Sequence, residues 1–182
     1  TAHFYYNRAI DKSDAGDNYG AISDYSKAIE INPRYVDAYN NRGNVKVLLK
    51  DYAGALSDFN TVIEINPRYA GAYYNRGNIK GRDLKDYSGA LSDFNQAIEI
   101  DPNNDQAYIS RGMAKSKLED YYGAISDYNK AIEIKPNYVF AYSNRGLAKK
   151  LIGDMKGACS DWEKASSLGN QKSASRVRNQ CQ

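Results

Sequence analysis

The chain has 182 residues, which suits one domain or one short repeat array. Hydrophobic residues make up 42% of it, and the net charge of +3 comes from interspersed basic and acidic residues, so nucleic acid is not an expected partner. No apolar run approaches the roughly 18–20 residues that span a bilayer, so we expect no direct membrane insertion.

The first two predicted elements are near copies of each other. Residues 2–35 contain the segment YYNRAIDK and then AISDYSKAIEINP, and residues 36–69 contain YNNRGNVK and then ALSDFNTVIEINP. The second segment of each pair has the i, i+4, i+7, i+8 spacing of an amphipathic helix, at Ala55, Phe59, Val62 and Ile63. Proline then ends this helix. In the preceding helix Gly43 allows two backbones to approach closely, which must outweigh a helix cost of roughly 1 kcal/mol.

The third element, residues 70–104, is one residue longer than the others and carries Gly81 in its first helix. We therefore expect a bulge or a longer turn that perturbs this helix. The fourth and fifth elements, residues 105–138 and 139–172, return to the common length.

The fifth element has Asn170 in place of the terminal proline. We expect the chain to continue there into a capping helix at about residues 171–182, because a stack of repeats needs a polar-backed end.

Prolines recur at spacings of 34, 35 and 34 residues, which predicts stacked helical hairpins: Pro33, Pro67, Pro102 and Pro136. The repeated pattern of aromatic, small and proline residues resembles the tetratricopeptide repeat (TPR) of prokaryotic proteins. The fourth element carries it at Tyr108, Gly112, Ala124, Tyr128, Ala131 and Pro136. The resemblance implies an all-α fold, a right-handed α-solenoid of five antiparallel helix-turn-helix hairpins with a C-terminal capping helix, as a single domain over residues 1–182.

Arginine and aspartate recur once in each element, at the edge of the seam within each hairpin. A guanidinium at such a position needs a partner, so we predict a structural Arg–Asp latch. The pairs are Arg8–Asp24, Arg42–Asp58, Arg76–Asp93, Arg111–Asp127 and Arg145–Asp161. The alternative is a basic column that faces a ligand. A column of lysines is predicted to be solvated helix surface: Lys12, Lys46, Lys80, Lys115 and Lys149.

A polar column precedes the arginines by one residue: Asn7, Asn41, Asn75, Ser110 and Asn144. In the TPR family this face lines the concave groove. An amide offers a donor and an acceptor, as a peptide bond does, so we predict an asparagine ladder that binds an extended peptide. The alternative is a solvated polar face that keeps the groove soluble.

Further groove residues are expected around this ladder: Tyr6, Asn40, Asn44, Tyr74, Asn78, Ile109, Met113 and Phe140. Rigid aromatic side chains dominate binding energy, so Tyr6, Tyr74 and Phe140 are the expected anchors. Two interpretations remain for Phe140, which stands alone in a polar column. It either marks a pocket or packs under the capping helix.

Cys159 and Cys181 lie near the C-terminus, and they are either two separate thiols or a disulfide. A disulfide would fix the capping helix and would imply an oxidising compartment. The sequence favours a cytoplasmic protein. A periplasmic or secreted location follows instead if a leader was removed or if the cysteines pair.

We expect a protein–protein interaction scaffold with a protein or peptide partner, as a monomer or a weak homo-oligomer. Enzymatic activity, cofactors and metal are not expected, because the chain has one histidine, no phosphate-binding glycine loop and no metal-spaced cluster. Two other functions stay open. One is a self-associating structural module, and the other is an assembly factor that docks a folded complex through its convex face.

Overall fold

The computed structural model describes residues 1–181, which form eleven α-helices and one π-helix. They divide into two compact units, one from Thr1 to Leu84 and one from Lys85 on. The fold is all-α and built of antiparallel helical hairpins, as predicted. Within residues 1–181, no helix is both long and apolar enough to span a membrane.

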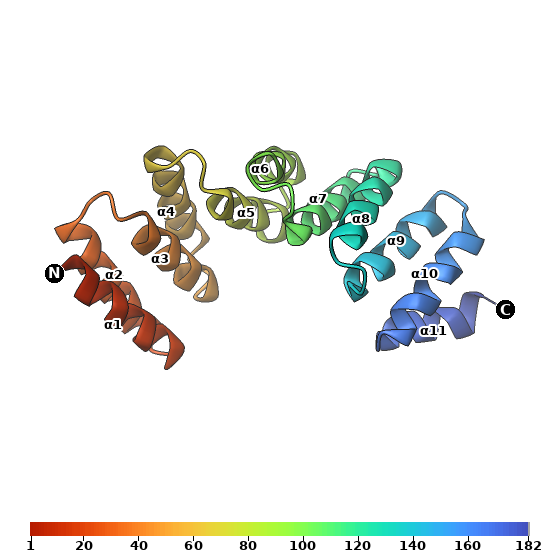
Figure 1. The fold of residues 1–182 in the computed structure, drawn as a ribbon, viewed down its shortest axis with the longest axis horizontal. Coiled ribbons are helices and arrows are strands. Elements are labelled where there is room, and N and C mark those ends of the chain that lie inside the picture. The colour runs from red at the N-terminus through yellow and green to blue at the C-terminus, as the bar shows by residue number, and fades with distance from the viewer. Residues whose placement is uncertain (182) are drawn as a thin grey trace. The chain divides into compact units, whose positions relative to one another are not determined.

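The first unit contains two hairpins, α1–α2 and α3–α4, followed by α5, which packs on α4 and runs directly into η1 (Figure 1). The bounds of its helices are α1 (Ala2–Asp14), α2 (Asn18–Ile31), α3 (Val36–Leu48), α4 (Tyr52–Ile65), α5 (Ala70–Asn78) and η1 (Ile79–Asp83).

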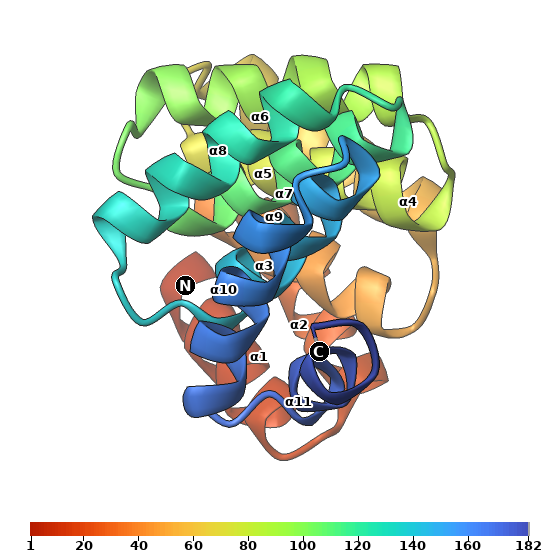
Figure 2. The same ribbon diagram turned by 90° about the vertical axis from the view of Figure 1, so that its right-hand side faces the viewer.

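The second unit begins with α6, which packs on α7, and continues with the hairpins α7–α8 and α9–α10. The last helix, α11, packs on α10, as Figure 2 shows at the C-terminal end. The bounds are α6 (Tyr87–Ile100), α7 (Asp105–Lys117), α8 (Tyr121–Ile134), α9 (Val139–Leu151), α10 (Met155–Ser167) and α11 (Gln171–Gln180).

The second helix of each hairpin begins at an aspartate cap. The carboxylate of Asp51, for example, accepts a hydrogen bond from the Gly54 N–H at 3.0 Å, which satisfies a donor that the first turn leaves free. A Cβ atom on Gly54 would collide with this carboxylate, so the glycine makes room for the cap. The helix ends at Ile65, and its C-cap residue Asn66 is extended because Pro67 follows.

Glycines also bring the two helices of a hairpin together, as the sequence predicts. A Cβ atom on Gly43 would lie 2.8 Å from Cε1 of Phe59, and one on Gly112 would lie 2.7 Å from Cε1 of Tyr128. The rings of Phe59 and Tyr128 are buried against these backbones. The close approach therefore determines how each first helix lies on its second helix.

The perturbation expected near Gly81 is confirmed as the π-helix η1. The N–H of Leu84 bonds to the carbonyl of Ile79 at 3.0 Å, a five-residue step in place of the usual four. One extra residue thus fits into the helix while Ile79 stays buried in the core of the first unit.

Candidate functional site

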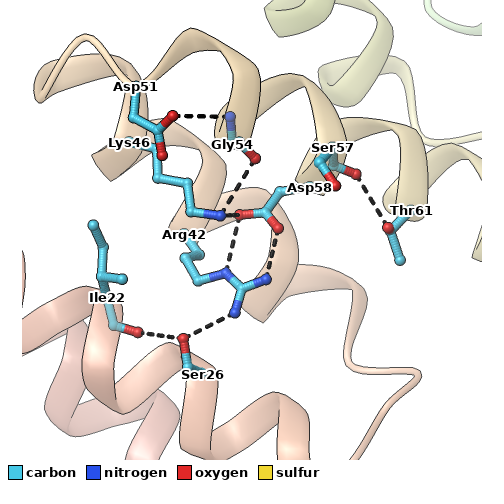
Figure 3. Close-up of polar contacts among 9 residues, drawn as sticks. All are labelled: Ile22, Ser26, Arg42, Lys46, Asp51, Gly54, Ser57, Asp58 and Thr61. Atoms are coloured by element: carbon cyan, nitrogen blue, oxygen red, sulfur yellow. Dashed lines mark hydrogen bonds and ion pairs between the residues drawn. The ribbon is translucent and has the colours of Figure 1, made fainter.

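An ion-pair node joins the two helices of four hairpins, and Figure 3 shows the one around Asp58. The Asp58 carboxylate is 2% exposed. It accepts hydrogen bonds from Nε and Nη2 of Arg42 at 3.0 and 2.6 Å, so the pairing is bidentate. Nζ of Lys46 lies 2.7 Å from its second oxygen. One buried carboxylate on α4 therefore neutralises two cations from α3.

Three other hairpins have the same node, centred on Asp24, Asp127 and Asp161. The predicted arginine bonds to the aspartate through two nitrogens in each. Asp93 is equally buried. That these pairs serve as stabilising latches stays a prediction, which the variants below test.

The expectation that the lysine column is solvated surface is wrong for four of its members. Lys12, Lys46, Lys115 and Lys149 each form an ion pair with the hairpin's aspartate. Each lysine follows its arginine by four residues, so one helical turn brings both cations to the same carboxylate. This spacing was visible in the sequence and could have identified the pairs.

The arginines also bond to the hairpin before their own. Nη1 of Arg42 donates to Oγ of Ser26 on α2 at 2.9 Å, and that hydroxyl donates to the Ile22 carbonyl (Figure 3). Arg76, Arg111 and Arg145 donate in the same way to an asparagine of the preceding helix: Asn60, Asn95 and Asn129. The guanidinium thus couples stacking between hairpins to pairing within one.

The ion pairs affect the titration of Asp24. The Arg8 guanidinium, hydrogen-bonded to this carboxylate, holds the pKa of Asp24 well below its usual value, and Lys12 adds to the effect. Burial opposes this shift but does not reverse it.

In the first unit the predicted ladder residues come together along α1, α3 and α5. Nδ2 of Asn41 donates to the hydroxyl of Tyr6 at 3.0 Å, and Nδ2 of Asn75 donates to Oδ1 of Asn44 at 3.0 Å. Asn7 lies 3.1 Å from the ring nitrogen of His3. Each of the three amides therefore donates to a neighbour in the protein, and Asn75 donates also to Oδ1 of Asn40 at 3.5 Å.

The ladder amides are thus hydrogen-bonded within the protein. Because the repeat is 34 residues long, successive first helices lie close enough for one amide to bond to the helix before it. Asn40 departs from the expectation of a groove residue: it is 8% exposed, and its Nδ2 donates to Oδ1 of Asn41 at 3.3 Å. It can orient Asn41 but offers little surface to a ligand.

Aromatic rings border the ladder at its N-terminal end. Tyr6 packs on Tyr25 and Tyr35, with ring centroids 5.9 and 4.8 Å away. Burial raises the pKa of Tyr25 to about 12 and also raises that of Tyr6, so both hydroxyls stay protonated at neutral pH. Tyr74 and Asn78 on α5 are partly exposed.

A cavity of about 270 Å³ opens between α1 and α3 beside Asn41 and Asn44. Its wall includes Ile10, Asp14 and Leu48, none of which the sequence pattern identified as groove residues. Leu48 is 70% exposed. The first unit therefore combines an amide ladder with an adjoining, partly apolar cavity.

In the second unit the predicted groove residues lie on α7 and α9. Ser110 and Asn144 are partly exposed, Ile109 is buried, and Met113 is exposed. Phe140 is 62% exposed and packs edge-on against Tyr138 at 6.2 Å, so it does not lie buried under α11.

Cys159 and Cys181 form a disulfide in this structure, which decides between the two alternatives left by the sequence. The bond joins α10 to the residue that follows α11. Among residues 1–181, no group of three or more His, Cys, Asp or Glu side chains is arranged to hold a metal ion.

Family models of the tetratricopeptide repeat match residues 36–69, 70–104 and 106–138, and a TPR repeat model matches residues 14–50. Together they cover more than half of the chain. The protein therefore belongs to the tetratricopeptide repeat family. No curated protein matches the sequence.

Solved TPR structures have the same fold. MamA is 25% identical with a TM-score of 0.82, over 91% of this chain and 96% of its own. YrrB, described as a TPR protein with an unusual peptide-binding site, is 23% identical with a TM-score of 0.81, over 98% and 92%. PilW, a type IV pilus biogenesis factor, is 19% identical with a TM-score of 0.83, over 100% and 92%. Family and fold together support a protein–protein interaction scaffold.

Replacing Asp58 with alanine should lower the free energy of unfolding by about 3 kcal/mol, because Arg42 and Lys46 would lose their carboxylate at a buried site. Urea denaturation measures the change. Asp11→Ala removes the same charge from an exposed position on α1 and should change stability by less than about 0.5 kcal/mol. Equal stabilities of the two variants would contradict the latch.

The low pKa of Asp24 predicts an acid-dependent loss of stability. The carboxyl group of Asp24 binds its proton less tightly in the folded protein than in the unfolded chain. The ion pair therefore stabilises the fold fully at pH values above the pKa of the unfolded state. This stabilisation is lost as the pH falls through the pKa of the folded state. Between roughly pH 5 and pH 2, wild type should therefore lose more stability than Asp24→Asn. Urea denaturation across this range, with Asp11→Asn as the control, measures the difference. If the free energies of unfolding of wild type and Asp24→Asn changed in parallel with pH, the low pKa of Asp24 would be contradicted.

Proposed function

We propose that this protein is a binding scaffold, not an enzyme, and that it holds an extended segment of a partner polypeptide on the inner faces of its first helices. Within the first unit the binding residues are Tyr6, Asn7, Asn41, Asn44, Asn75, Tyr74 and Asn78. Within the second unit they are Ser110, Asn144 and Phe140. Asn40, which is buried, orients Asn41 through its hydrogen bond to Oδ1.

The observation that carries the proposal is the hydrogen-bonded row of amides on α1, α3 and α5. Because a neighbour engages one N–H of each amide, the side chain has a fixed orientation before a partner arrives, and less entropy is lost on binding. Asn7 keeps a second N–H, and within residues 1–181 no donor bonds to Oδ1 of Asn7 or Asn75. These groups can pair with the carbonyl and N–H groups of a peptide backbone.

Side-chain selectivity would come from the surfaces beside the row. The cavity at Ile10 and Leu48 can take one apolar side chain of the partner, with Asp14 at its wall. The exposed ring of Phe140 offers a second contact in the other unit. YrrB, which shares the fold, is described as having a peptide-binding site, so this fold is compatible with the proposed role.

The double variant Asn41→Ala/Asn75→Ala tests the proposal. It removes two oriented amides from the row, and we expect it to weaken peptide binding about tenfold or more, since each lost hydrogen bond costs about 1 kcal/mol. Fluorescence anisotropy with a peptide selected by the wild-type protein from a random nonapeptide library measures the affinity.

The matched control is Asn60→Ala/Asn129→Ala, which removes two exposed asparagines of α4 and α8 that bond only to arginines of the next hairpin. It should keep the peptide affinity of wild type. Equal losses in both double variants, or none in the ladder variant, would contradict the proposal. If wild type selects no peptide but light scattering detects concentration-dependent association, the self-associating module is supported instead.

A further inference from the structure

The last helix of the chain continues the row of ladder residues. In the first unit, Asn41 and Asn75 each donate a hydrogen bond to a side chain on the preceding first helix. The acceptor is the residue immediately before the ladder residue of that helix. Asn41 donates to Tyr6, which precedes Asn7, and Asn75 donates to Asn40 at 3.5 Å, which precedes Asn41. In the second unit, Nη1 of Arg176 on α11 donates to Oγ of Ser143 at 3.3 Å, and Ser143 precedes Asn144. By this contact Arg176 follows Asn144 in the row.

The burial pattern of α11 gives the same register independently. A fully buried alanine lies three positions before the four ladder residues that follow Asn7: Ala38, Ala72, Ala107 and Ala141. Ser173 is also fully buried, and it lies three positions before Arg176. Its hydroxyl donates to Oγ of Ser143 at 3.2 Å. The capping helix therefore packs as the first helix of a further hairpin.

Arg176 is held in place from two sides. Its guanidinium lies over the buried ring of Trp162 at 5.7 Å, and the disulfide Cys159–Cys181 ties the end of α11 to α10. A cation above an indole ring is attracted to its face, so the arginine has a preferred position.

The charge at this position is not neutralised by the protein. Arg42, Arg111 and Arg145 each have a bidentate aspartate partner. In the described part of the chain no carboxylate pairs with Arg176 or with Lys172, which is exposed one turn earlier on α11. The helix carries three basic residues and no acidic one. Guanidinium and ammonium groups at a binding surface favour a carboxylate ligand.

We propose that Arg176 and Lys172 bind an aspartate or glutamate side chain of the partner peptide, and so determine specificity at the C-terminal end of the second unit. The inference rests on the proposed peptide-binding function and adds the chemical class of one partner residue. The neutral ladder residues Ser110 and Asn144 would contact the peptide backbone, whereas the charged pair would select one side chain.

The test is a selection from a random nonapeptide library whose members are acetylated and amidated, so that only side chains carry charge. Wild type, Lys172→Gln, Arg176→Gln and Arg178→Gln are compared. Arg178→Gln is the matched control, since it removes the same charge from the same helix at an exposed position whose partner is Ser175. Trp162 fluorescence verifies that α11 stays docked in each variant.

We expect wild type to enrich peptides with Asp or Glu at one fixed position, and to bind them about tenfold more tightly than the Asn or Gln versions. Lys172→Gln and Arg176→Gln should reduce this preference severalfold, while Arg178→Gln keeps it. Lys172 is exposed, so its variant reports on binding even if Arg176→Gln loosens α11.

Two outcomes overturn the inference while the proposed function stands: peptides are selected without an acidic preference, or the preference survives both substitutions. A preference that appears only in peptides with a free C-terminal carboxylate also overturns it, because the ligand is then not a side chain. If wild type selects no peptide, the proposed function itself fails, and this inference fails with it.

Discussion

In four hairpins a buried aspartate of the second helix bonds to two cations of the first helix. Asp58 accepts from Arg42 and Lys46 of the first helix, while the same arginine reaches Ser26 of the preceding hairpin. If these pairs act as the predicted latch, they restrain the rotation of the first helix about its axis. That rotation decides which residues face the inner surface, since Asn41 directly precedes Arg42. Lys46 pairs with the same carboxylate, and Asn41 itself donates to Tyr6 of α1, so further polar contacts support this arrangement.

The repeat length has a second consequence for the inner surface. Helices related by 34 residues lie close enough for one ladder amide to bond to the helix before it, so the row is organised without a ligand. In the proposed function this preorganisation lowers the entropic cost of binding, while it engages N–H groups of Asn41 and Asn75 within the protein. A bound peptide would then meet amides whose orientation is already set.

Much of this architecture could be predicted from the sequence, because it depends on local chemistry. Proline marks the helix ends, glycine marks close approach, and the extra residue near Gly81 predicts a bulge or a longer turn, which the structure forms as the π-helix. The lysine column differs from the predicted solvated surface, because four of its members lie one helical turn after the arginine and reach the same aspartate. The burial of Asn40 depends on contacts between hairpins, which periodicity alone does not give. For the same reason the cavity beside Leu48 was missed.

The proposed contact surface for a partner peptide is the row of amides on α1, α3 and α5. The side-chain amide NMR signals of Asn41 and Asn75 report on this surface during titration with a peptide selected by the wild-type protein. Both signals should shift with the same midpoint as binding, while the side-chain signal of Asn60, exposed on α4, stays unchanged. Shifts at Asn60 with unchanged signals for Asn41 and Asn75 would contradict the proposed surface.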